Sequence, residues 1–145
     1  RGIMEQLIRT KAGPFNLKNS ITLLEAHDLF QSWKESKDNK ILEPILKPLE
    51  TMLVDLPTIE VKDSAVDALC HGAELGIPGV SSVSKNMRRG QLVSIKTTRG
   101  EAVALARSSI DSNELISNAN SKGRVAKLER VIMERGTYPR EWKSK

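Results

Sequence analysis

The stretch AVDALCHGAELGIPGV, Ala65–Val80, decides the fold, because a helical pattern gives way there to glycine and proline. Four of its apolar residues recur at the spacing of one helix face: Val66, Leu69, Cys70 and Ala73. Ser64 and Asp67 have the spacing of a capping box at the start of this helix. The pattern therefore predicts a helix that buries Cys70 as an unreactive thiol.

The segment after this helix, GIPGVSSVSK, has two possible readings. A second helix here would complete a helix-turn-helix motif that reads DNA. Proline inside a helix costs about 3 kcal/mol and glycine about 1 kcal/mol relative to alanine, so Pro78 and Gly79 favour a loop. We expect this loop to face outward, so that a bulky residue at Gly79 would disturb ligand binding more than folding.

Strand patterns lie on both sides of the helix. TIEV precedes it, and QLVSIKTTRGEAVALAR predicts a hairpin of Gln91–Thr98 and Glu101–Arg107 with its turn at Arg99-Gly100. One helical turn is expected near Ser112–Ile116, and GRVAKLERVIM alternates well enough for a long strand. One helix and several strands in so short a region predict an α+β fold, a small and mostly-β pseudo-barrel with a covering helix.

Residues 1–57 have a different pattern. The Gly-Pro pair in KAGPF interrupts the first segment. Thr22 and Glu25 have the spacing of a capping box for a helix over Leu23–Glu35. We expect the apolar stripe of this helix to be buried, with Trp33 in the core. The stripe consists of Ala26, Leu29, Phe30 and Trp33. Prolines divide the next apolar segment, with Pro48 as the first residue of a helical turn. We expect one domain to end at residue 57 and a second to cover 58–145.

Charge is distributed unevenly along the chain. Residues 1–84 hold 9 lysines and arginines against 12 acidic residues, whereas residues 85–145 hold 14 against 6. The basic half either faces a polyanion, with nucleic acid the leading candidate, or is a solvated surface. One cysteine and two histidines far apart give neither a disulfide framework nor a zinc site. No apolar run approaches the roughly 18 residues of a membrane span, and the first residues lack the pattern of a signal peptide.

Five stretches carry a resemblance to a known family: VKDSAVDALCHGAELGIPGV, GQLVSIKTTRGEAVALA, KGRVAKLERVIMERGTYPREW, EQLIRTKAGPF and LKPLETML. The first three resemble the PUA domain of the dyskerin family of RNA-guided pseudouridine synthases. The last two resemble the final motif of the catalytic domain in the wider TruB-type family and the connector between the domains. The resemblance covers about Met4 to Trp142 and is closest to the archaeal branch.

This resemblance implies an enzyme that isomerises uridine in RNA to pseudouridine through an aspartate in a Gly-rich motif. No aspartate of this chain lies in such a context. We expect Asp67 to cap a helix, Asp38 to lie in a turn and Asp28 to lie on a helix surface. We therefore expect the chain alone to be inactive, and we expect no cofactor and no metal.

Two residues match the family's LRR pattern. Leu7 corresponds to the leucine that lines the floor of the catalytic pocket, and Arg9 corresponds to the second arginine, whereas Ile8 replaces the first. The replacement removes a charge that could contact phosphate. Leu7 is either a pocket residue or an ordinary core residue of the catalytic domain.

The resemblance also implies an RNA-binding cleft between the glycine-rich loop and the last strand. This cleft would hold the single-stranded ACA end and lower stem of a guide RNA. The residues expected to contact RNA are His71, Gly72, Ala73, Leu75, Gly76, Pro78, Gly79, Lys127, Arg130, Tyr138 and Arg140. Glycines let RNA approach the main chain, whereas Leu75, Ile77 and Pro78 would contact base faces. With 3% aromatic residues, a stacking sheet of the RRM type is excluded.

Some of these roles have alternatives. His71 either contacts RNA or hydrogen-bonds locally at the helix end. Tyr138 and Trp142 either stack on bases or anchor the tail to the domain. The Arg88-Arg89 turn is the alternative RNA site if the loop is not the cleft.

The sequence leaves two functions open. The first is the RNA-docking part of an H/ACA guide-RNA-dependent synthase, whose partners would be the guide RNA, a tRNA or rRNA substrate and small protein subunits, with no membrane. It would be cytoplasmic if archaeal and nucleolar if eukaryotic. The second is a stand-alone PUA-type RNA-binding or ribosome-associated protein. EQLIRTKAGPF and the start at Arg1 favour the first, because a stand-alone binder has no use for a catalytic-domain motif.

Overall fold

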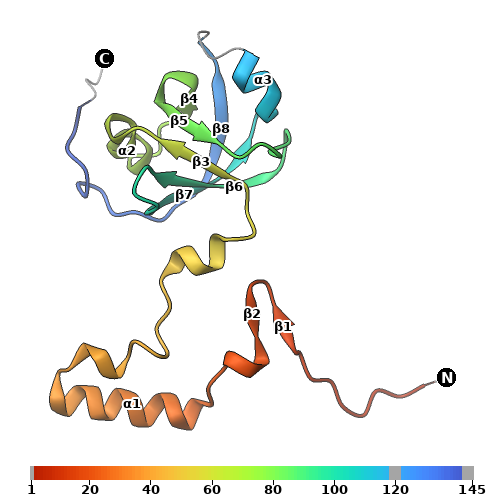
Figure 1. Cartoon of the computed structure of the whole chain (residues 1–145), viewed down its shortest axis with the longest axis vertical. Coiled ribbons are helices and arrows are strands. Elements are labelled where there is room, and N and C mark those ends of the chain that lie inside the picture. Colours follow the sequence, from red (N-terminus) through yellow and green to blue (C-terminus); the bar gives the residue numbers. More distant parts are fainter. Residues whose placement is uncertain (1, 118–121, 142–145) are drawn as a thin grey trace. The chain divides into compact units, whose positions relative to one another are not determined.

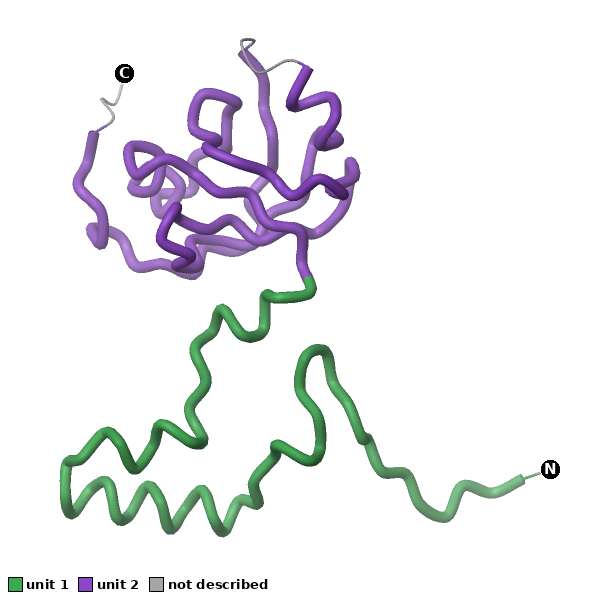
Figure 2. The backbone as a smooth tube through the Cα atoms, viewed as in Figure 1, with its two compact units in different colours: residues 1–55 green, residues 56–145 purple. Residues whose placement is uncertain are grey.

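The computed structural model describes residues 2–117 and 122–141 and divides into two compact units, residues 1–55 and 56–145 (Figure 2). The domain boundary that we expect after residue 57 lies just beyond this division. Among the described residues, no helix has the length and apolar character needed to cross a membrane.

Unit 1, residues 1–55, contains one long helix and several short elements. They are β1 (Lys11–Ala12), β2 (Phe15–Asn16), the 3₁₀ helix η1 (Leu17–Asn19), α1 (Leu23–Ser36), η2 (Asn39–Ile41) and η3 (Leu49–Leu53). The predicted capping box is confirmed, because the Thr22 hydroxyl accepts from the Glu25 N–H and the Glu25 carboxylate accepts from the Thr22 N–H. Pro48 is the residue before η3 and not its first residue, which corrects the predicted position by one.

The prediction that Trp33 lies in a core is wrong for this chain. No residue of α1 is buried, and among the described residues of unit 1 only Leu42 and Leu53 are. The Trp33 indole N–H instead donates to the Asn39 side chain at 2.9 Å, and the Lys37 ammonium lies 5.0 Å from the ring centroid. The apolar stripe of α1 is therefore only partly covered within its own unit.

Unit 2, residues 56–145, is the predicted α+β pseudo-barrel (Figure 1). Its elements are β3 (Thr58–Val61), α2 (Asp63–Cys70), β4 (Leu75–Gly76), η4 (Ile77–Gly79), β5 (Val80–Val83), β6 (Leu92–Thr97), β7 (Ala102–Ser108), α3 (Ser112–Ser117) and β8 (Arg124–Val131). Strand β3, the hairpin β6–β7, the helical turn of α3 and the long strand β8 confirm the sequence predictions.

The six strands form one sheet in the order β4-β8-β7-β6-β3-β5. β3 and β6 are parallel, and the other pairs are antiparallel. The two edge strands of this order, β4 and β5, are joined by η4 alone. Since η4 has only 3 residues, the edges must lie near each other, and the sheet curls almost into a barrel.

Helix α2 contributes its apolar face to the core of this barrel. Val66, Leu69 and Cys70 are buried, as predicted, whereas Ala73 lies beyond the helix end and is exposed. Burial raises the pKa of the Cys70 thiol, and the nearby Asp67 carboxylate adds to this increase. The thiol is therefore kept protonated, in agreement with its expected inertness.

The predicted capping box of α2 is absent. The helix begins at Asp63, one residue before Ser64, so its N-cap is Lys62, which makes no side-chain capping bond. Asp67 is not a cap, because it lies in the second turn with 3% of its surface exposed. Ser64 and Asp67 therefore have the spacing of a capping box, but they do not lie at the N-cap and N3 positions of the helix.

The segment after α2 is more ordered than the predicted loop, because Gly76–Val83 contains η4 and β5. Gly79 does not face outward. A Cβ atom on Gly79 would lie 3.1 Å from the Ala65 Cβ and 3.3 Å from the Leu75 Cδ1, so the missing side chain makes room for close packing. The expectation that a bulky residue at Gly79 would spare the fold is therefore wrong.

We predict that Gly79→Val destabilises unit 2 by about 1–3 kcal/mol, as overpacking of a dense core does. The melting temperature should fall by roughly 4–8 °C for each kcal/mol in a domain of this size. Gly76→Ala is the control, because a Cβ there would meet its neighbours at an ordinary 3.6 Å. Equal melting temperatures of the two variants in thermal denaturation would contradict the inward orientation.

Candidate nucleic-acid interface

The glycine-rich loop and the last strand lie side by side, as the predicted cleft requires. Leu75 and Gly76 of β4 pair with Ala126 and Arg124 of β8, and the Ile77 N–H donates to the Gly123 carbonyl at 3.0 Å. The Arg124 guanidinium also pairs with the Glu74 carboxylate at 2.7 Å, across 50 positions of sequence. The structure therefore brings the two halves of the predicted site together.

The loop exposes only some of its side chains to solvent. Gly72, Ala73 and Pro78 are exposed, and Gly72 has a φ of +89°, which glycine adopts without strain. Leu75 and Ile77 are 2% and 8% exposed because they belong to the core. Their side chains therefore cannot supply the expected contact with base faces, which corrects that prediction.

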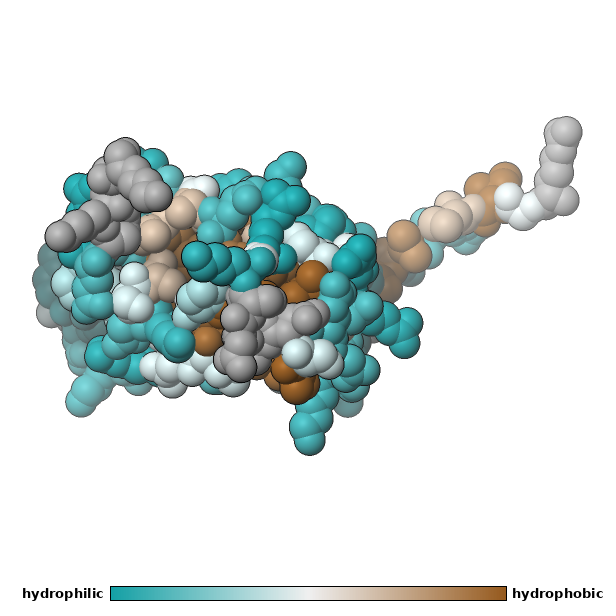
Figure 3. Space-filling view, turned by 90° about the horizontal axis from the view of Figure 1, so that it is seen from above, coloured by the Kyte–Doolittle hydropathy of each residue, from teal (hydrophilic) through white to brown (hydrophobic). Residues whose placement is uncertain are grey.

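An apolar groove runs beside the loop. Its volume is about 410 Å³, and it is lined by Pro78, by residues of β5 and by Leu115 and Ile116 of α3. The Ile116 side chain is 63% exposed. Lys62 and Lys85 also line the groove, and the Lys62 ammonium donates to the Pro78 carbonyl at 2.9 Å. Apolar surface is visible between hydrophilic side chains in Figure 3.

This groove was missed by the sequence analysis. The residues of α3 were expected only as a turn in a polar link, and no local signal connects them to Pro78. The apolar pair Leu115-Ile116, which directly follows Glu114, was the one available signal in the sequence.

A bulge in β8 places two predicted contact residues on one face. In an ideal strand, residues three apart such as Lys127 and Arg130 point to opposite faces. Here the register shifts, so that Lys127 pairs with Arg107 and Arg130 with Leu105, which are two apart on β7. Both cations are therefore on the outer face of the sheet, and neither has an ion-pair partner among the described residues.

His71 makes local hydrogen-bond contacts at the end of α2. Its Nδ1 lies 2.8 Å from the Asp67 carbonyl oxygen and 3.5 Å from the Asp67 carboxylate, and the side chain is 40% exposed. This geometry supports the local role that the sequence left open. Within the described residues, no group of three His, Cys, Asp or Glu side chains is placed to hold a metal ion.

Two family models match the chain. The PUA domain matches residues 57–132, and the C-terminal domain of tRNA pseudouridylate synthase B matches residues 1–54. The chain belongs to the TruB and dyskerin family. Its unit 2 contains a PUA domain, which confirms the resemblance seen in the sequence.

Curated relatives cover nearly the whole chain. The probable tRNA pseudouridine synthase B of Methanosarcina barkeri is 42% identical over 144 residues, which are 99% of this chain and 42% of the relative. That of Methanocaldococcus jannaschii is 43% identical over 142 residues, which are 98% of this chain and 42% of the relative. The chain thus spans less than half the length of these relatives.

Solved structures of the family share this fold. One is an H/ACA RNP bound to a substrate RNA containing 2′-deoxyuridine, with a TM-score of 0.85 and 36% identity over 92% of this chain and 42% of that chain. Another is an archaeal box H/ACA sRNP Nop10–Cbf5 complex, with a TM-score of 0.85 and 35% identity over 92% of this chain and 43% of that chain.

In unit 2, Tyr138 anchors the tail that follows β8. Its side chain is 8% exposed, its hydroxyl donates to the Glu101 carboxylate, and its ring lies 5.7 Å from the Arg99 guanidinium carbon. The Thr97 hydroxyl donates to the same carboxylate at 3.0 Å. These contacts support anchoring and not base stacking. Arg140 is exposed on the tail, whereas Trp142 lies outside the described residues.

Leu7 and Arg9 lie in the segment that matches the TruB C-terminal domain. Leu7 is 80% exposed, and Arg9 lines a hollow of about 180 Å³ with residues of β1, β2 and η1. The structure does not place Leu7 in a core. Its role in a catalytic pocket stays a prediction.

Tyr138→Phe should destabilise unit 2 by about 1 kcal/mol, the net value of a typical hydrogen bond. The hydrogen bond to Glu101 raises the pKa of Tyr138, so the folded state holds the phenolic proton more tightly than the unfolded state. This stabilisation is present below the ordinary tyrosine pKa of about 10 and is lost as pH rises through the higher folded pKa.

Urea denaturation of parent and Tyr138→Phe at neutral and strongly alkaline pH measures this effect. The stability difference should shrink at alkaline pH, because only the parent releases this proton. A difference that stays constant through the tyrosine titration would exclude the hydrogen bond as its cause.

Proposed function

We propose that this chain is the RNA-docking part of an H/ACA guide-RNA-dependent pseudouridine synthase that acts on tRNA or rRNA. The observation that supports this most is the pairing of the glycine-rich loop with β8, beside an apolar groove and cations that have no ion-pair partner among the described residues. The family membership supports RNA as the polyanion that the basic half of the chain faces.

Each part of the surface suits a different part of an RNA end. Main-chain groups near Gly72 and Gly76 suit close approach by a backbone. The groove of about 410 Å³ suits an unpaired base, with the lysines at its rim near phosphates. Lys127 and Arg130 suit the backbone of an adjoining stem. We therefore propose that the ACA end lies at the loop and groove and that the lower stem lies along β8.

The remaining partners follow from the solved relatives. Cbf5 has been solved with Nop10 and with Gar1, and we propose that small protein subunits also bind the protein to which this chain belongs. The isomerisation itself would need an aspartate in a context that this chain lacks. An archaeal protein would act in the cytoplasm, and a eukaryotic one in the nucleolus.

A stand-alone PUA protein is the less favoured function. The match of residues 1–54 to the TruB C-terminal domain is not expected for it. The partly exposed stripe of α1 is consistent with a segment that packs against a larger domain.

The binding of a hairpin RNA with a single-stranded 3′ end should weaken steeply with salt. If about four phosphates are neutralised, log K should fall against log salt with a slope of roughly −3 to −4. Lys127→Ala and Arg130→Ala should each make the slope shallower by roughly 0.7–0.9, and Lys40→Ala in unit 1 should not. Fluorescence anisotropy across a salt series measures the slopes. Identical slopes for all variants would remove β8 from the interface.

The groove should set the preference for the 3′ end. We expect a hairpin that ends in ACA to bind more tightly than one that ends in a uridine run. Ile116→Gln should weaken this preference, because it replaces an apolar wall of the groove by an amide. Leu24→Gln, at a similarly exposed position of α1, is the control. Equal affinity of the parent for both hairpins would refute the proposed recognition of the ACA end.

A further inference from the structure

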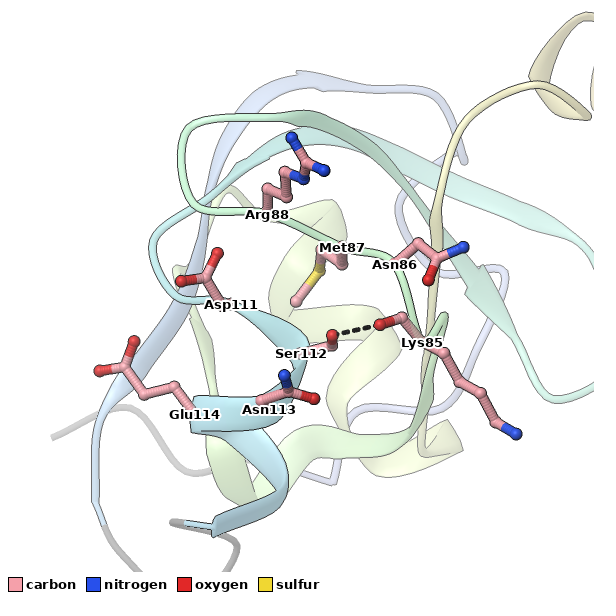
Figure 4. Close-up of a pocket in the computed structure, with 8 residues that line it drawn as sticks. All are labelled: Lys85, Asn86, Met87, Arg88, Asp111, Ser112, Asn113 and Glu114. Atoms are coloured by element: carbon pink, nitrogen blue, oxygen red, sulfur yellow. Dashed lines mark hydrogen bonds between the residues drawn. The ribbon is translucent and has the colours of Figure 1, made fainter.

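A second, polar pocket lies beyond the groove, between the β5–β6 loop and the start of α3 (Figure 4). Its volume is about 920 Å³. The loop wall carries Lys85, Asn86 and Arg88, and the helix wall carries Asp111, Asn113 and Glu114. Of the residues that line this pocket, only Lys85 also lines the groove of the proposed ACA site.

The two walls are tied together beneath the pocket, so the site is formed in advance. The Ser112 hydroxyl donates to the Lys85 carbonyl, and the Ser112 N–H donates to the Met87 carbonyl at 3.0 Å. Met87 is 1% exposed and forms part of the floor. Arg89 joins the walls as well, because its N–H donates to the Asp111 carboxylate at 2.7 Å.

The charges of the pocket are separated between the walls. Among the described residues, the side chains of Lys85 and Arg88 have no ion-pair partner and are exposed. The Glu114 carboxylate lies 3.3 Å from the Arg89 guanidinium, so its charge is partly neutralised. An anionic group is therefore favoured at the loop wall and hydrogen-bond donors at the helix wall.

A nucleotide has this combination of groups. The side chains of Lys85 and Arg88 point apart (Figure 4), so they match the two phosphates that flank a nucleotide in a strand. An exocyclic amino group matches the carboxylates, which only accept hydrogen bonds. The amides Asn86 and Asn113 can donate and accept along a base edge. Adenine, cytosine and guanine carry an amino group and uracil does not, so the pocket should disfavour uridine.

The polar pocket and the apolar groove are neighbours. Lys85 lines both, and α3 gives Leu115 and Ile116 to the groove and its first residues to the pocket. A single strand that leaves the groove over Lys85 would enter the pocket directly.

We propose that this pocket is a second nucleotide-binding site, which holds an unpaired, amino-bearing nucleotide of the same RNA strand that binds at the glycine-rich loop. The inference rests on the proposed function. It lengthens the single strand that the domain binds by at least one nucleotide.

The test uses the full chain and hairpin RNAs whose single-stranded ends lengthen one nucleotide at a time, with adenosine or uridine at the added positions. For the parent, affinity should rise by about fivefold at the length that reaches the pocket, which corresponds to one exposed ion pair. The rise should be larger with adenosine. The salt slope should steepen there by roughly 0.7 for each added phosphate contact.

The double variant Arg88→Ala/Asn113→Ala should lose this rise and keep its affinity for the short RNA, since neither residue lines the groove. Arg135→Ala, which removes one exposed cation of the tail, should keep the rise. Melting curves establish that each variant is folded. The inference would be overturned if the rise in affinity persisted in the folded double variant, or if the parent bound the short RNA but showed no rise. Neither result would contradict the proposed function. If the parent binds neither RNA, the proposed function falls with it.

Discussion

The barrel of unit 2 depends on how closely η4 joins the two edge strands. The Lys62 N–H, just after β3, donates to the Gly79 carbonyl at 2.9 Å, and the Ile77 N–H holds the other end of η4 to Gly123. Gly79 permits this approach because a side chain there would press on Ala65 and Leu75. A short, tightly packed connection thus brings the two edge strands near each other, so that the sheet almost closes.

The same connection explains why the candidate interface has its composition. Packing turns Leu75 and Ile77 into the core, so the outward surface of the segment is made of main chain, Pro78 and residues without large side chains. Specific contacts must then come from neighbours: the cations of β8 and the apolar residues of α3. In the proposed function, RNA recognition and barrel closure therefore use opposite faces of the same few residues.

Sequence patterns predicted the elements whose signals are local. The hairpin at Gly100, the α1 capping box and the length of β8 all followed from spacing and turn chemistry. The inward orientation of Gly79 could not be predicted in this way, because it depends on side chains from other segments. The face on which Arg130 lies depends on a bulge, and no residue type in β8 indicates that bulge. The groove depends on the proximity of α3 and η4, which are far apart in the sequence. The predictions failed where the local sequence allowed two orientations of a residue and contacts with distant segments determined which one forms.

The pairing of β4 with β8 also has a consequence for how the domain is made. Gly76 pairs with Arg124, so a chain emerging from the ribosome must expose nearly the whole domain before its loop finds this partner. Contacts so distant in sequence form late, because they require the closure of a long loop. A nascent chain that ends before β8 would thus have the glycine-rich segment without its neighbour strand, and the proposed RNA site would be incomplete until the last strand is in place.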